Sequence, residues 1–263
     1  MGRSRWTSER RPARREPTSP PVNEHLVELL LLIDACRRSR AGRVTAVVPY
    51  FGYARQDRRT APGQALGSAV VADAIAAAGV DRLVIVDPHT PTLEAVCRIP
   101  AEALSAVPVL AGELAGGLPD GAVVVAPDLG AVKLAERYAA VLGGPVAVVR
   151  KQRDAGSAVA ALDVAGDVRG RPAVIVDDMI TTGATIEAAV GLLRARGAAP
   201  DIVVAATHGL FVHAAAGRLQ RLGLRRVLVS DTVAVKATGI GIASVAPTIA
   251  DAVACLHADR PLP

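Results

Sequence analysis

Short apolar runs alternate with helical patterns along almost the whole chain, and this alternation is the feature that most constrains the fold. The runs at 82–86, 174–178 and 201–209 are rich in β-branched residues, whereas 66–79 and 185–197 are rich in alanine or leucine and end at a glycine, as helices do. Strands that alternate with helices of about 10–15 residues are typical of βαβ units. The sequence therefore predicts an α/β protein with mostly parallel sheets.

The composition agrees with buried parallel strands. Apolar residues make up 51% of the 263 residues but aromatic residues only 2%, so alanine, valine, leucine and isoleucine must build the core. Strands covered by helices on both faces carry such aliphatic runs. The pattern occurs in two similar halves, and we expect two related α/β domains. We place a disordered basic arm at 1–21, a first domain at 22–110 and a second at 111–263, and we allow the last helix to pack on the first domain.

The distribution of charge argues against a nucleic-acid partner. The formal net charge is +5, but residues 1–21 hold six arginines and two glutamates, a net of +4, which leaves +1 for the rest. An extended basic surface is therefore not expected. No apolar run reaches the ~20 residues of a membrane span. The three cysteines, Cys36, Cys97 and Cys255, are too scattered for a disulfide framework, and we expect a cytoplasmic protein with free thiols.

Polar side chains follow most of the predicted strands. In open parallel sheets, ligands bind beyond the carboxyl ends of the strands, so these side chains are the candidates for a site. They include a basic loop, a histidine, a second basic run and three aspartates. The candidates are Arg55, Gln56, Asp57, Arg58, His89, Asp128, Lys151, Arg153, Asp177 and Asp178.

The chemistry of these residues indicates phosphate and a divalent cation. Arginine and lysine are phosphate partners, and His89 and the three aspartates can hold Mg²⁺ directly or through water. Taken singly, each side chain would more often be structural, because a strand-end acid is frequently a cap and a basic loop is frequently solvated. Their recurrence at successive strand ends is what favours a site.

One segment, "VIVDDMITTGAT" at 174–185, indicates more closely which kind of ligand binds. Its loop, formed by Thr181, Thr182, Gly183, Ala184 and Thr185, stands between a strand and a helix. Backbone N–H groups, hydroxyls and the helix dipole there form an anion site suited to a phosphate monoester. The two preceding acids can accept hydrogen bonds from vicinal sugar hydroxyls. The segment therefore predicts a site for a phosphorylated pentose.

Several segments resemble a known family. "VIVDDMITTGAT" is similar to the phosphoribosyl-pyrophosphate loop of type I phosphoribosyltransferases, and "VVPYFGYARQDRR" at 47–59 resembles the ATP-site segment of ribose-phosphate pyrophosphokinases, the PRPP synthetases. "DPHTP", "APDLGAVKLAERYA", "KQR" and "SVAPTIADAVACLH" match that family in the expected order. The resemblance runs from Val22 to His257.

The resemblance implies two phosphoribosyltransferase-like domains and one reaction. That reaction transfers the diphosphoryl group of ATP to C1 of ribose 5-phosphate with Mg²⁺, giving 5-phosphoribosyl 1-diphosphate and AMP for nucleotide biosynthesis. It further implies a homo-oligomer, as dimers or hexamers. By matched position it implies ATP binding by Arg55, Gln56, Asp57 and Arg58, metal binding by His89 and Asp128, catalysis by Lys151 and Arg153, and ribose 5-phosphate binding by Asp177, Asp178 and residues 181–185.

The sequence also departs from the family pattern. The resemblance implies a first domain truncated at its N-terminus, without the hairpin that completes the ATP site of a neighbouring subunit, so either the start is misassigned or ATP binds poorly. Thr181 stands where regulated relatives carry an acid. A catalytically weak paralogue or regulatory subunit is therefore one alternative. A nucleobase phosphoribosyltransferase is another, although it would have no reason to keep "FGYARQDR".

Overall fold

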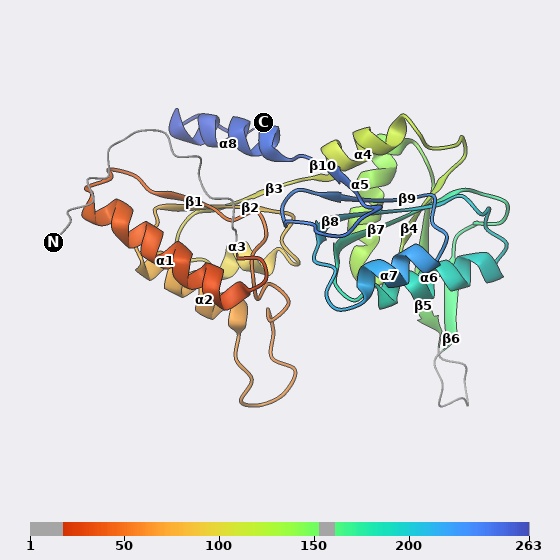
Figure 1. The fold of residues 1–263 in the computed structure, drawn as a ribbon, viewed down its shortest axis with the longest axis horizontal. Helices are drawn as coiled ribbons and strands as arrows, with labels where there is room; N and C mark the ends of the chain where they lie inside the picture. The colour runs from red at the N-terminus through yellow and green to blue at the C-terminus, as the bar shows by residue number, and fades with distance from the viewer. Residues whose placement is uncertain (1–17, 153–160, 263) are drawn as a thin grey trace.

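Two halves, each built on parallel strands, follow one another along the long axis of the molecule (Figure 1). The computed structural model describes residues 18–152 and 161–262. The first half holds a three-stranded sheet in the order β1-β2-β3, and the second a seven-stranded sheet in the order β10-β9-β8-β7-β4-β5-β6. Every neighbouring pair is parallel except β5 and β6. The predicted α/β class with mostly parallel sheets is therefore confirmed.

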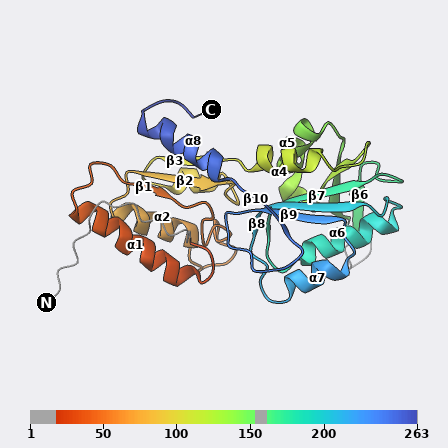
Figure 2. The ribbon, with the colours of Figure 1, turned by 45° about the horizontal axis from the view of Figure 1, so that its top comes forward.

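The first half has α1 and α2 on one face of its sheet (Figure 2). Aliphatic side chains from these helices and from the strands form its core, among them Ile33, Val48, Ile75 and Leu83, each less than 4% exposed. The elements are α1 (Val22–Arg38), β1 (Thr45–Val47), α2 (Gly67–Ala77), β2 (Arg82–Val86), α3 (Thr92–Val96) and β3 (Ala101–Leu104).

The second half has helices on both faces of its sheet, with α4 and α5 on one face and α6 and α7 on the other (Figure 2). Burial on both faces explains why its central strands read as continuous aliphatic runs. The elements are α4 (Val107–Ala115), β4 (Val123–Ala126), a 3₁₀ turn η1 (Leu129–Ala131), α5 (Val132–Leu142), β5 (Val146–Gln152), β6 (Ala161–Ala165), β7 (Ala173–Ile180), α6 (Ala184–Ala195), β8 (Ile202–Gly209), α7 (Ala215–Arg221), β9 (Arg226–Ser230), β10 (Gly241–Ala243) and α8 (Ala246–His257).

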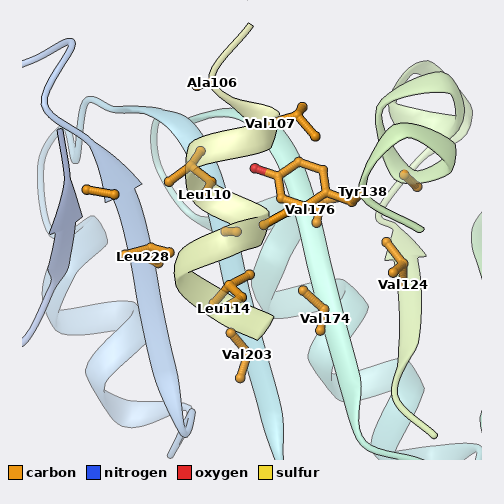
Figure 3. Close-up of a cluster of buried hydrophobic side chains, with 14 of the residues drawn as sticks. Ala106, Val107, Leu110, Leu114, Val124, Tyr138, Val174, Val176, Val203 and Leu228 are labelled. Atoms are coloured by element: carbon orange, nitrogen blue, oxygen red, sulfur yellow. The ribbon is translucent and has the colours of Figure 1, made fainter. Parts of the chain in front are cut away.

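Tyr138 is the largest side chain in the core beneath α4 and α5. Its ring lies between Leu110 of α4 and Val176 of β7, and it is fully buried (Figure 3). Its hydroxyl has no hydrogen-bond partner among the described residues. Burial raises the pKa of this phenol far above its ordinary value, so it stays neutral.

The last helix, α8, returns to the first half, where it lies over the face of the small sheet opposite α1 and α2 (Figures 1 and 2). Arg43 anchors its end, because one guanidinium nitrogen lies 2.9 Å from Oδ1 of Asp259 and the other donates to the carbonyl of His257 at 2.7 Å. Its buried side chains include Ala252 and Leu256. No helix in the described ranges combines the length and the apolar character that crossing a membrane requires.

Three boundaries differ from those expected from the sequence. Helix α4 starts at Val107 and already packs on the second sheet, so the second half begins before residue 111. The predicted arm extended to Pro21, yet Thr18 is fully buried and its hydroxyl accepts a hydrogen bond from the N–H of Gly52. The sequence of 211–223 predicts one helix, whereas α7 starts only at Ala215, because Phe211 has a positive φ that no right-handed helix contains.

Candidate functional site

A pocket of about 1150 Å³ lies where the carboxyl ends of strands from the two sheets face each other. Asp87 and His89 follow strand β2 of the first half, Asp128 follows strand β4 of the second half, and Asp177 lies in the last four residues of strand β7. This placement follows from the parallel order of the strands, which brings their carboxyl ends to one edge. The predicted candidates that line the pocket are Arg55, Arg58, His89, Asp128, Asp177, Asp178 and Thr185.

His89 and Asp178 join the two halves inside this pocket. The Nδ1 atom of His89 lies 2.6 Å from Oδ2 of Asp178. The hydrogen bond that the ring nitrogen donates to Asp178 raises the pKa of His89 above its ordinary value. Burial alone would raise the pKa of Asp178, but the hydrogen bond and the charge of His89 lower it. The contact therefore favours the charged form of each partner, while Nε2 of His89 is not engaged by Asp178.

Asp177 differs from its neighbour in charge. Its Oδ1 atom accepts a hydrogen bond from the N–H of Asp178 at 2.9 Å. Burial, followed by the nearby charge of Asp178, raises the pKa of Asp177 well above its ordinary value. Two adjacent acids in one pocket thus have opposite tendencies, one to keep its proton and one to lose it. Both remain able to exchange hydrogen bonds with the hydroxyls of a sugar.

Asp128 lies at the amino end of η1. Its Oδ1 atom accepts hydrogen bonds from the N–H groups of Gly130 at 2.8 Å and Ala131 at 3.2 Å. These bonds fix the carboxylate at the mouth of β4. Asp128 therefore caps η1, as strand-end acids often do, and it also lines the pocket.

The loop before α6 has the form expected for an anion site, but only part of it reaches the pocket. Gly183, with a φ of 74°, ends the loop at the position before α6, where a left-handed backbone favours glycine. Thr185, in the first turn of α6, lines the pocket. Thr181, Thr182, Gly183 and Ala184 do not line it.

The basic loop of the first half is also split. Arg55 and Arg58 line the pocket, and Gln56 and Asp57 do not. The carbonyl of Gln56 instead accepts a hydrogen bond from the hydroxyl of Ser68 at 3.1 Å, which ties the loop to α2. The hydrogen bond from Arg58 lowers the pKa of Asp57, whose side chain is 8% exposed. Gln56 and Asp57 therefore hold the loop through contacts outside the pocket.

The two residues predicted to be catalytic lie at the edge of the described structure. Lys151 belongs to strand β5, next to the pocket-lining Arg150, and its side chain is not described. Arg153 lies outside the described residues. Their roles therefore stay predictions.

Two pocket residues were missed from the sequence. Lys133 and Arg137 lie one turn apart on α5 and both line the pocket. Arg137 donates to the hydroxyl of Ser105, and its Nη1 atom lies 3.6 Å from Oδ1 of Asp87. The spacing of Lys133 and Arg137 could have predicted this, because residues four apart on a helix share a face. Their helix also follows closely on Asp128, which was already a candidate.

His89 and Asp128 offer a nitrogen and an oxygen donor to one pocket. No group of three or more histidine, cysteine or acidic side chains in the described ranges could hold a metal alone. Mg²⁺, however, commonly uses one or two protein ligands and completes its shell with phosphate oxygens and water. The residues therefore fit a cation that binds together with a phosphorylated ligand.

The two halves match two family models, which define the class of protein. Residues 110–227 match the phosphoribosyl transferase domain, and residues 16–79 match the N-terminal domain of ribose phosphate pyrophosphokinase. The site at the strand ends of the second half is thus built on a phosphoribosyl transferase domain.

The chain belongs to the ribose-phosphate pyrophosphokinase family. It is 40% identical over 249 residues to the ribose-phosphate pyrophosphokinase of Gloeobacter violaceus, covering 93% of this chain and 75% of that protein. It is 40% identical over 241 residues to that of Mycobacterium tuberculosis strain H37Rv, covering 89% and 74%. The crystal structure of phosphoribosylpyrophosphate synthetase from Mycobacterium smegmatis matches with a TM-score of 0.84 at 36% identity, covering 92% of this chain and 80% of that one.

Proposed function

We propose that this chain is a ribose-phosphate diphosphokinase, which transfers the diphosphoryl group of ATP to C1 of ribose 5-phosphate. One observation carries the proposal. The basic loop and His89 of the first half line the same pocket as the paired acids and Thr185 of the second. A nucleobase phosphoribosyltransferase would not need the basic loop, which lies within the match to the pyrophosphokinase N-terminal domain.

The proposed reaction is a displacement at the β-phosphorus of ATP. The C1 hydroxyl oxygen of ribose 5-phosphate bonds to this phosphorus, and the bond from the phosphorus to the oxygen bridging to the α-phosphate breaks. AMP leaves with that oxygen, and the hydroxyl proton is released. Such transfers depend on positioning and on neutralisation of charge more than on covalent help from the protein.

The second half supplies the sugar site in this proposal. The N–H groups at the start of α6 and the threonine hydroxyls of 181–185 bind the 5-phosphate. Asp177 and Asp178 exchange hydrogen bonds with the ribose hydroxyls, and the opposite shifts of their pKa values suit one as a donor and the other as an acceptor.

The first half supplies the nucleotide site. Arg55 and Arg58 bind the phosphates of ATP, since both guanidinium groups line the pocket and have the fork geometry that phosphate oxygens favour. Lys151 and Arg153 stabilise the charge of the transferring group. His89 and Asp128 hold Mg²⁺ with the phosphates, and the cation supplies neutralisation of charge on the diphosphoryl group.

A direct assay tests this function. The purified chain is supplied with ribose 5-phosphate, ATP and Mg²⁺, and ³¹P nuclear magnetic resonance follows AMP and the C1-linked diphosphate. We expect the two products in equal amounts. Formation of ADP and a C1 monophosphate would contradict the diphosphoryl transfer. ATP unchanged relative to an enzyme-free blank would instead favour the weak paralogue or regulatory subunit.

We also propose that the chain acts as a homo-oligomer in the cytoplasm. Val27, Leu31 and Leu32 on α1 are 50% or more exposed, which is an apolar surface suited to burial between copies. Light scattering during size-exclusion chromatography measures the assembly. A monomeric mass across the concentration range would contradict self-association.

A further inference from the structure

We propose that Asp87 is a positioning residue, which fixes the first half against the second and so holds His89 at Asp178. We call the contacts between Asp87 and the second half the tie. Its existence is argued from these contacts alone, whereas its effect on kinetics rests on the proposed function. Asp87 follows directly on β2 and is 8% exposed. Its φ is 34°, a left-handed conformation that is uncommon for residues other than glycine. Such a conformation persists only where the surroundings determine it.

The side chain of Asp87 is bound from the second half. Its Oδ2 atom accepts hydrogen bonds from the N–H of Ala106 at 2.9 Å and from the hydroxyl of Thr207, in β8, at 2.8 Å. Its Oδ1 atom faces Nη1 of Arg137, in α5, at 3.6 Å. One carboxylate of the first half thus contacts the segment before α4, strand β8 and helix α5. Both of its oxygens are used, so the carboxylate has little freedom to turn.

The backbone of Asp87 is bound as well. Its N–H donates to the carbonyl of Leu104 at 2.9 Å, and its own carbonyl oxygen lies 3.2 Å from Nε2 of His208. The Nδ1 atom of His208 lies in turn 2.8 Å from the hydroxyl oxygen of Thr232. His208 is 2% exposed, so this contact is shielded from water. The buried histidine therefore fixes the position of the Asp87 peptide from the second sheet.

Thr207, which binds Asp87 from the second half, is itself held by a buried hydrogen bond. The hydroxyl of Ser230 donates to the carbonyl of Thr207 at 2.6 Å, and Ser230 and Thr207 are both fully buried. Buried hydrogen-bond networks in which each member has its partners are rigid. Asp87 is consequently held by a fixed frame rather than by mobile surface groups.

The position of His89 depends on this frame. Only Pro88 separates the two residues, and its ring restricts the backbone between them. A change in the peptide of Asp87 therefore moves the imidazole, which lies 2.6 Å from Asp178. The sugar contacts of 177–185 all belong to the second half, and a displaced His89 leaves them in place. Loss of Asp87 should therefore lower kcat and leave KM for ribose 5-phosphate almost unchanged.

The tie is tested first without any activity measurement. Chemical denaturation is compared for the wild type, Asp87→Asn, Thr207→Val and the double variant. Thr207→Val is isosteric and keeps the fold, and Thr207→Ser keeps the hydroxyl as the matched control. We expect the two substitutions to be non-additive, because Thr207→Val removes the donor of a hydrogen bond whose charged acceptor Asp87→Asn makes neutral. Additive effects, or equal losses in Thr207→Val and Thr207→Ser, would overturn the tie.

The positioning role is tested by kinetics in two backgrounds. In the wild type, Asp87→Asn and Thr207→Val should each lower kcat about tenfold or more, as misplacement of a reacting group does, and Thr207→Ser should restore it. In the His89→Ala background, Asp87→Asn should change kcat by less than about twofold. The same fold loss in both backgrounds would overturn the proposal. A wild type without activity would refute the proposed function instead, and the denaturation experiment would still decide the tie.

Discussion

Nδ1 of His89 and Oδ2 of Asp178 lie 2.6 Å apart, although the two residues belong to different sheets and are separated by 89 positions in the sequence. The contact shows that the pocket is completed by both halves together. We expect Asp178→Asn to lower kcat/KM by about 10–100-fold, because the ionised acceptor of the hydrogen bond from His89 is replaced by a neutral amide. Steady-state kinetics measures the loss.

The control for this substitution is Asp167→Asn. Asp167 is exposed and does not line the pocket, so its variant should keep the wild-type rate. If both asparagine variants lost activity equally, the contact between His89 and Asp178 would not be what matters.

Lys151→Ala should act on turnover rather than on sugar binding. A cation that stabilises the transferring group acts mainly in the transition state, and its loss should lower kcat by about 10²–10³-fold. Titration calorimetry with ribose 5-phosphate should give a nearly unchanged Kd. Lys236→Ala is the matched control, since Lys236 is exposed and does not line the pocket. An unchanged kcat in Lys151→Ala would refute the assigned role.

Tyr138→Phe should leave the protein as stable as the wild type or more stable by up to about 1 kcal/mol. The hydroxyl has no partner in the part of the chain that the structure describes, so its removal relieves an unsatisfied buried group. Tyr138→Ala should cost about 3–5 kcal/mol, because it leaves a cavity beneath α4 and α5. Urea denaturation compares the two. A loss of more than about 2 kcal/mol in Tyr138→Phe would mean that the hydroxyl is hydrogen-bonded.

Asp81 should make stability depend on pH at acidic values. Its carboxylate accepts a hydrogen bond from the N–H of Val44 at 2.6 Å and pairs with Arg37, and these contacts lower its pKa, the first more than the second. A lowered folded-state pKa contributes stability above the unfolded value of about 3.9, and this stability is lost as the pH falls through the folded value. The wild type should therefore exceed Asp81→Asn in stability at pH 7, and the difference should shrink below about pH 4. A difference that is constant between pH 7 and pH 3 would contradict this cause.

The alternation of patterns was sufficient to predict the α/β class and the placement of polar residues at strand ends. Both follow from local rules, because a parallel strand must be buried on both faces and its carboxyl end must meet its neighbours. The candidates His89, Asp128 and Asp178 accordingly line one pocket, and their roles stay predictions. Thr185 was identified because a loop followed by a helix presents N–H groups.

What escaped prediction depends on contacts distant in sequence. Arg137 reads as an ordinary surface residue until α5 packs on the sheet and turns one of its faces to the pocket. Thr207 and His208 lie in the strand predicted at 201–209, but their link to Asp87 exists only once the halves meet. The late start of α7 reflects a local backbone conformation, the positive φ of Phe211, that no apolar periodicity encodes.

The return of α8 to the first sheet gives the order of synthesis a structural consequence. Residues 246–257 leave the ribosome well after the strands that α8 covers. At typical elongation rates, the residues between β3 and α8 take on the order of ten seconds to translate. One face of the first sheet therefore waits uncovered during translation, and the nascent chain presents that face to chaperones before the helix that covers it has been made.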